Sequence, residues 1–106
     1  MRCRVLRLLI MFDLPTLTAE DRHNYRQFRK RLFQDGFTMM QESIYTCIVI
    51  DRQAANLLNN KISLYAPKQG LVQSLIVTEK QFASMHFLTG EKNTSEENTF
   101  ERLTVI

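Results

Sequence analysis

An almost unbroken apolar run near the amino terminus constrains the fold of this chain more than any other feature. Residues 5–12 read V-L-R-L-L-I-M-F, and Asp13, Leu14 and Pro15 follow directly. Such a run is typical of a central β-strand that is covered on at least one face. Proline cannot donate a hydrogen bond to a sheet ladder, so Pro15 marks the end of the strand. The sequence therefore predicts a sheet built around its own first strand.

A helix is predicted after this strand. Thr18 is placed to be its N-cap, and Asp21 follows three residues later in the capping-box position. Gly36 is a typical residue at the carboxyl-terminal end of a helix. Three apolar side chains recur at helical spacing and are expected to face the core: Tyr25, Phe28 and Leu32.

The following segments predict alternating strands and helices. Residues 37–50 are expected to form two strands, with a bend near residues 41–43. Asp51 is expected to cap a second helix that ends near Leu64. Residues 71–78 predict another strand and residues 78–82 a short helical turn. The core stripe of the second helix is expected to be Ala54, Leu58, Ile62 and Tyr65.

The last third of the chain predicts smaller elements. Residues 85–88 predict a short strand, residues from about 90 to 101 a polar loop, and residues from about 102 to 106 a last strand. The order is then β-α-β-β-α-β with extra carboxyl-terminal strands. This order predicts an α+β fold, the ferredoxin-like βαββαβ sandwich.

The composition indicates one folded domain and excludes several kinds of site. A chain of 106 residues, 44% hydrophobic and 24% charged, fits a single domain over residues 1–106. Cys3 and Cys47 form no CxxC motif, which argues against zinc and against a disulfide framework. His23 and His86 are expected to be surface or packing residues. No run approaches the roughly 20 apolar residues of a membrane span, so we expect a cytoplasmic location and no membrane partner.

Asp13 is the first candidate for chemistry, because it ends the first strand. A carboxylate there can coordinate Mg²⁺, which prefers oxygen ligands, and two copies of it across a dimer axis would make a stronger site. A bound metal could activate water against a phosphodiester. The alternative is an aspartate that ends the strand and binds local backbone amides.

The first predicted helix carries the second candidate. Four cations fall at positions i, i+4, i+7 and i+8 and form one stripe: Arg22, Arg26, Arg29 and Lys30. Such a stripe can track the phosphates of a nucleic acid, and Arg2, Arg4 and Arg7 could extend it. The formal net charge is only +3, so a solvated face whose cations pair with scattered carboxylates is the other interpretation. A third hypothesis is a regulatory domain that binds a small ligand.

Several motifs, in their order and spacing, resemble the second core family of CRISPR-associated proteins (the Cas-two family). They are residues 9–15 (L-I-M-F-D-L-P), the arginine-rich first helix, Gly36-Phe37, Gln41-x-Ser43-x-Tyr45, residues 78–83 and residues 90–94. The last two segments resemble members from systems with a single large RNA-guided nuclease. The resemblance implies a ferredoxin-like homodimer that partners the CRISPR integrase and binds double-stranded DNA during spacer acquisition.

The resemblance also implies an alternative activity. Family members are described as metal-dependent endonucleases that act on RNA and in some cases on DNA, and the matching metal residue here is Asp13. The alternative is therefore a Mg²⁺-dependent endoribonuclease that uses Asp13 from both subunits and takes single-stranded RNA. Many members have a basic residue near the Gln-x-Ser segment, where this chain has Met39, Met40 and Glu42. This departure weighs against nuclease activity, and the sequence leaves open whether the chain is an enzyme.

Overall fold

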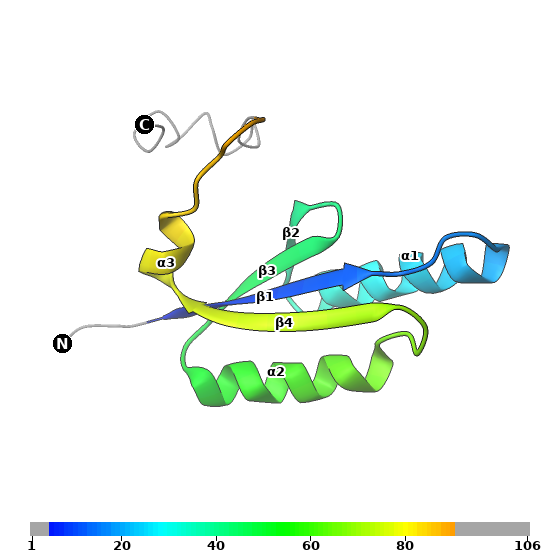
Figure 1. Ribbon diagram of the computed structural model, residues 1–106. Helices are drawn as coiled ribbons and strands as arrows, with labels where there is room; N and C mark the ends of the chain where they lie inside the picture. Colours follow the sequence, from blue (N-terminus) through cyan, green and yellow to red (C-terminus); the bar gives the residue numbers. More distant parts are fainter. Residues whose placement is uncertain (1–4, 91–106) are drawn as a thin grey trace.

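The computed structural model describes residues 5–90 of the chain. The elements run in the order β1 (Leu6–Asp13), α1 (Ala19–Gln34), β2 (Thr38–Gln41), β3 (Ile44–Val49), α2 (Arg52–Tyr65), β4 (Leu71–Thr78) and α3 (Glu79–Ala83) (Figure 1). The four strands form one antiparallel sheet in the order β2-β3-β1-β4. This is the predicted ferredoxin-like α+β arrangement, and the apolar first strand lies inside the sheet between β3 and β4.

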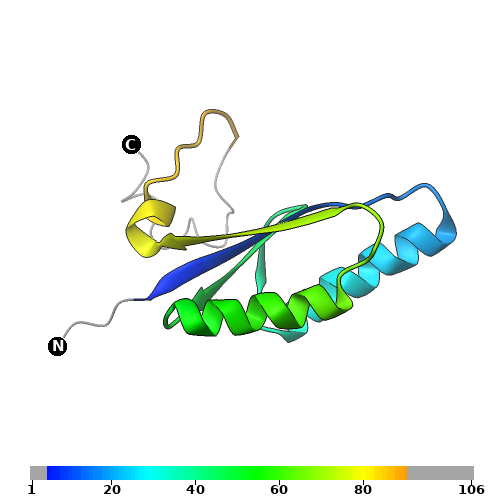
Figure 2. The ribbon, with the colours of Figure 1, turned by 60° about the horizontal axis from the view of Figure 1, so that its bottom comes forward.

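The sheet has one face covered by the two long helices and one that they leave open. Figures 1 and 2 both show α1 and α2 on the same side of the sheet and α3 on the other. Along β1, Leu8, Ile10 and Phe12 are buried against the helices. The residues between them point the opposite way, because successive side chains of a strand alternate between faces. Burial of each large apolar side chain contributes about 1.5–3 kcal/mol, and the helix-covered face holds the main core.

The helix boundaries follow the predicted caps. The backbone N–H of Asp21 donates to the Thr18 hydroxyl at 3.0 Å, and the Asp21 carboxylate accepts from the backbone N–H of Thr18 at 3.2 Å. Gly36 ends the α1 segment with a φ of 95°, a conformation that favours glycine. The Asp51 carboxylate accepts from the N–H of Ala54 and begins α2. The bend near residues 41–43 is also confirmed, because it separates β2 from β3.

Two details differ from the prediction. In α2 all four predicted residues belong to the core or pack against it, but the most buried residue is Ala55, which the prediction left out. Residues 85–88 form no strand. The capping box of α3 begins at Thr78, directly at the end of β4, so the chain leaves the sheet there, and residues 85–88 pair with no strand within residues 5–90.

Some predictions lie outside the described residues. These are the polar loop from residue 91 onward, the strand over residues 102–106, and the environments of Arg2, Cys3 and Arg4. The single domain over residues 1–106 therefore stays a prediction. Within residues 5–90, no helix is long and apolar enough to span a membrane.

Candidate nucleic-acid interface and metal ligand

Asp13 is the last residue of β1, as predicted, and its side chain is exposed. It lies opposite Leu71 of β4. The backbone N–H of Phe12 donates to the carbonyl of Ser43 at 3.0 Å, so the β2–β3 turn lies beside the same end of β1. On the other flank, Gly70 packs so closely that a Cβ atom there would lie 2.7 Å from the carbonyl oxygen of Asp13.

Asp13 belongs to the sheet face that α1 and α2 do not cover, which we call the open face. Its members follow from the alternation along β1 and the pairing register: Arg7, Leu9, Met11 and Asp13 of β1; Ile44, Thr46 and Ile48 of β3; and Leu71, Gln73, Leu75 and Val77 of β4. Most of these side chains are apolar. Ile48, Leu71 and Leu75 are each more than half exposed. The open face is therefore mostly apolar, with the Arg7 guanidinium toward one end of β1 and the Asp13 carboxylate at the other.

Within residues 5–90, Asp13 belongs to no cluster of side chains that could hold a metal ion by itself. Among residues 5–90, no group of three or more His, Cys, Asp or Glu side chains could hold a metal. No hydrogen bond or ion pair within that range engages the Asp13 carboxylate. A free, exposed carboxylate suits Mg²⁺, which takes oxygen ligands and keeps several waters. Asp13 therefore fits one position of such a site, and a second chain or nucleic acid could supply further ligands that residues 5–90 do not bring to it.

The predicted basic stripe lies on α1, which covers one side of the sheet (Figure 1), whereas the alternation along β1 places Asp13 on the open face. Arg26 and Lys30 are exposed and have no ion-pair partner among residues 5–90. Arg22 is also exposed, but its guanidinium donates to the carbonyls of Thr16 and Leu17 at 3.2 and 3.1 Å. The structure therefore divides the stripe, because Arg22 also holds the loop that precedes α1.

Arg29 is the most constrained cation of the stripe. Its Nε donates to the hydroxyl of Tyr45 at 2.8 Å, and its Cζ lies 5.8 Å from the centre of the Tyr25 ring. The hydrogen bond to Tyr45 raises the pKa of the Arg29 guanidinium above its already high ordinary value. Arg29 therefore stays charged and fastens α1 to β3. Sequence reasoning singled out Tyr45 in the Gln41-x-Ser43-x-Tyr45 segment but gave it no role.

The surroundings of Arg26 and Lys30 are free of acidic residues along the helices. α1 carries no carboxylate after Asp21, and α2 carries none at all. The nearest carboxylate after α1 is Asp35, which accepts from the Tyr65 hydroxyl at 2.8 Å and pairs with Lys61 at 2.9 Å. Its charge is thus largely neutralised within the fold. The outer surface of the two helices therefore keeps a positive potential, which attracts polyanions.

One cation was placed wrongly from the sequence. Arg7 cannot extend the α1 stripe, because it lies on the open face and binds Glu79 of α3. Arg7 and Asp13 are both odd-numbered residues of β1, so the alternation of side chains could have placed them on the same face. The alternation alone could not have shown which face the helices cover. His23 and His86 are exposed, and Cys47 is a half-buried free thiol.

Comparison with known proteins gives consistent matches. The family model described as CRISPR associated protein Cas2 matches residues 6–85. A protein of Ligilactobacillus salivarius named CRISPR-associated endoribonuclease Cas2 is 44% identical over 101 residues, which cover 95% of this chain and 100% of the relative. Proteins of the same name are 44% identical in Treponema denticola, over 95% of this chain and 100% of the relative, and in Streptococcus mutans, over 92% and 90%.

Proposed function

The chain belongs to the Cas2 family of CRISPR-associated proteins, and on this premise we propose that it is the dimeric scaffold and DNA-binding subunit of a CRISPR adaptation complex. Its partners would be a second copy, the CRISPR integrase and double-stranded DNA in the cytoplasm. Family membership gives the role in CRISPR defence. The observation that carries the finer proposal concerns Arg26 and Lys30, which have no ion-pair partner among residues 5–90. They lie on a helical surface whose own carboxylates, Glu20 and Asp21, are confined to the first turn of α1.

Contacts between exposed cations and DNA phosphates suit a scaffold. Phosphate contacts position a duplex without reading its sequence, and a subunit that accepts arbitrary spacers requires that property. A dimer would present two copies of the α1 surface to one duplex. A homodimer would place the same patch of each subunit around a two-fold axis.

We propose that the second copy covers the open face. Contiguous apolar surfaces of this kind are uncommon on monomers and mark interaction sites. Burial of the open face would remove Ile48, Leu71 and Leu75 from water and would bring the two sheets together. Asp13 lies at the end of this face, so a two-fold axis near that end would bring both Asp13 carboxylates together.

The alternative function is a Mg²⁺-dependent endoribonuclease that acts on single-stranded RNA. Two observations favour it: the relatives carry the name endoribonuclease, and the Asp13 carboxylate is free and exposed. A Mg²⁺ ion held there would supply an activated water and charge stabilisation at the phosphodiester. The chain's own contribution would be the Asp13 oxygens of each subunit. Against this, Asp13 and the α1 cations lie on opposite sides of the sheet, so cations on α1 do not hold RNA over Asp13 of the same chain.

The test compares duplex binding by three variants over a range of salt concentrations. Arg26→Ala with Lys30→Ala should weaken binding of a DNA duplex and reduce the slope of log affinity against log salt by about 0.9 for each lost phosphate contact. Asp13→Asn should bind the duplex like the unmodified protein. Lys80→Ala is the matched control, because it removes an exposed cation from α3 on the other side of the sheet.

The same samples test the alternative. Incubation with single-stranded RNA and duplex DNA, in Mg²⁺ or in EDTA, should show no cleavage by any variant if the chain is only a scaffold. Cleavage that needs Mg²⁺ and is lost in Asp13→Asn would establish the nuclease. Duplex binding and salt slope that are unchanged in the double variant would refute the assignment of the interface to α1.

A further inference from the structure

Arg7 stands out on the open face because it is a cation among apolar side chains. It lies in β1 opposite Ile48 of β3 and Val77 of β4. Its side chain is only 18% exposed. A partly buried guanidinium gains from partners, because removal of a charge from water is expensive unless the charge is paired and hydrogen-bonded.

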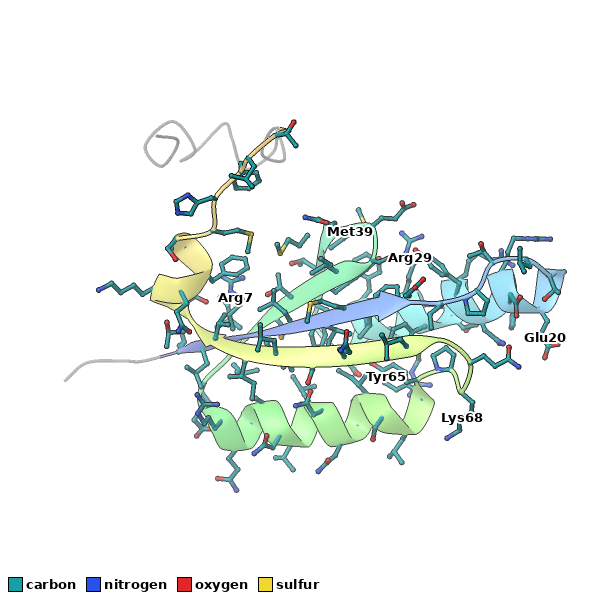
Figure 3. All side chains as sticks on the ribbon, viewed as in Figure 1. Arg7, Glu20, Arg29, Met39, Tyr65 and Lys68 are labelled. Atoms are coloured by element: carbon teal, nitrogen blue, oxygen red, sulfur yellow. The ribbon has the colours of Figure 1, made fainter. Side chains whose placement is uncertain are left out.

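The partners of Arg7 come from α3, which lies against the same face (Figure 3). The Nε atom donates to Glu79 Oε2 at 2.7 Å, and Nη2 donates to Oε1 at 2.9 Å. Two parallel bonds of this kind are the strong, geometrically specific form of an arginine–carboxylate pair. The Arg7 Cζ also lies 4.2 Å from the centre of the Phe82 ring. We call the three residues Arg7, Glu79 and Phe82 the α3 clamp.

α3 depends on contacts of this kind. It has only five residues, and isolated helices of such length are not stable in water. Its capping box, between Thr78 and Gln81, satisfies the first backbone donors. The α3 clamp is the other described polar attachment, and it joins residues 72 positions apart in the sequence. The clamp therefore holds α3 against one end of the open face, and Asp13 lies at the other end of the same face.

We propose that the α3 clamp makes the open face fit for burial against a second copy. The inference rests on the proposed dimer. Glu79 neutralises Arg7 within its own chain, so a second copy can cover the face without burying an unpaired charge. An unpaired charge buried at an interface is strongly destabilising. α3 at the same time forms one border of the face. Arg7 and Glu79 are thus positioning residues for dimer assembly, and the cation of Arg7 is not available to nucleic acid.

Glu79→Gln tests this proposal, because it removes the charge of Glu79 and keeps its shape. The dissociation constant of the dimer, measured by sedimentation equilibrium, should rise at least about tenfold, since loss of one partner leaves Arg7 charged at the interface. The double variant Arg7→Met with Glu79→Gln removes both charges and should return to within about threefold of the unmodified protein. Glu20→Gln is the matched control at an exposed carboxylate of α1, and it should leave the dimer unchanged.

The outcomes separate this inference from the proposed function. A dimer in which Glu79→Gln has no effect would overturn the clamp's role and leave the proposed dimer intact. Equal weakening in the single and double variants would also overturn it, because charge neutralisation would not be the cause. A protein that is monomeric without any substitution would refute the proposed dimer itself, and the inference with it.

Discussion

The hydrogen bond between Arg29 and Tyr45 makes it possible to separate folding from nucleic-acid binding within one helix. Tyr45 has a 0% exposed side chain, and Arg29 Nε is the described donor to its hydroxyl, at 2.8 Å. Arg29→Ala removes that donor and leaves the hydroxyl without a partner. An unsatisfied buried polar group costs about 1–3 kcal/mol, so we expect this loss in the free energy of unfolding. The melting temperature should fall by about 4–8 °C for each kcal/mol.

Arg26 is the matched control, because it is an exposed arginine one turn earlier on the same helix. Arg26→Ala should change the free energy of unfolding by less than about 0.5 kcal/mol, while it weakens duplex binding. Urea denaturation followed by circular dichroism, with an unchanged m-value, measures both variants.

The double variant Arg29→Ala with Tyr45→Phe isolates the buried hydroxyl. It should be more stable than Arg29→Ala alone, because replacement of both partners by apolar groups leaves no unsatisfied atom. Equal losses in Arg29→Ala and Arg26→Ala would refute this reasoning. So would a double variant whose loss equals the sum of the two single losses, since that would show no coupling between the two side chains.

Two further predictions concern stability. Gly70→Ala should cost about 2 kcal/mol or more in urea denaturation, because φ is 98° and the new Cβ would lie 2.7 Å from the Asp13 carbonyl oxygen; unchanged stability would contradict the close approach. Burial alone would raise the pKa of Asp35, but the hydrogen bonds from Lys61 and Tyr65 lower it overall. Asp35 therefore stabilises the fold above the ordinary carboxyl pKa of about 3.9 and loses that contribution as the pH falls through the lowered value. Asp35→Asn should flatten the fall of the urea midpoint below about pH 4, and parallel curves for the two proteins would contradict this.

Local patterns predicted most of the elements. The apolar run of β1, the Thr18 capping box and the glycine after α1 each depend on residues within a few positions of one another. The bend between β2 and β3 follows from a strand pattern too long for one strand. In these cases short-range sterics and hydrogen bonds decide the conformation, and the sequence contains all the participants. The prediction over residues 85–88 was wrong because a strand also needs a neighbour to pair with, and local pattern cannot supply one.

The candidate site was less accessible to the same reasoning. Helical spacing predicted that four cations lie on one stripe of the first helix. The structure confirms that these residues belong to one helix, α1. Spacing could not show that Arg29 donates to Tyr45, 16 residues away, or that Arg22 binds backbone carbonyls of the preceding loop. Those bonds divide the stripe into cations that hold the fold and cations that are free to meet a phosphate.

The sequence by itself determined the α+β order, the caps, the central position of β1 and the placement of Asp13 at its end. Each of these follows from the local chemistry of neighbouring residues and from the repeat of apolar side chains, every two residues in a strand and about every 3.6 residues in a helix. Only the tertiary structure decided which sheet face the helices cover, and therefore that Asp13 and the α1 cations lie on opposite sides. It also decided that Arg7 pairs with Glu79 across 72 positions. The physical reason is that packing brings together groups whose separation in sequence carries no information about their distance in space.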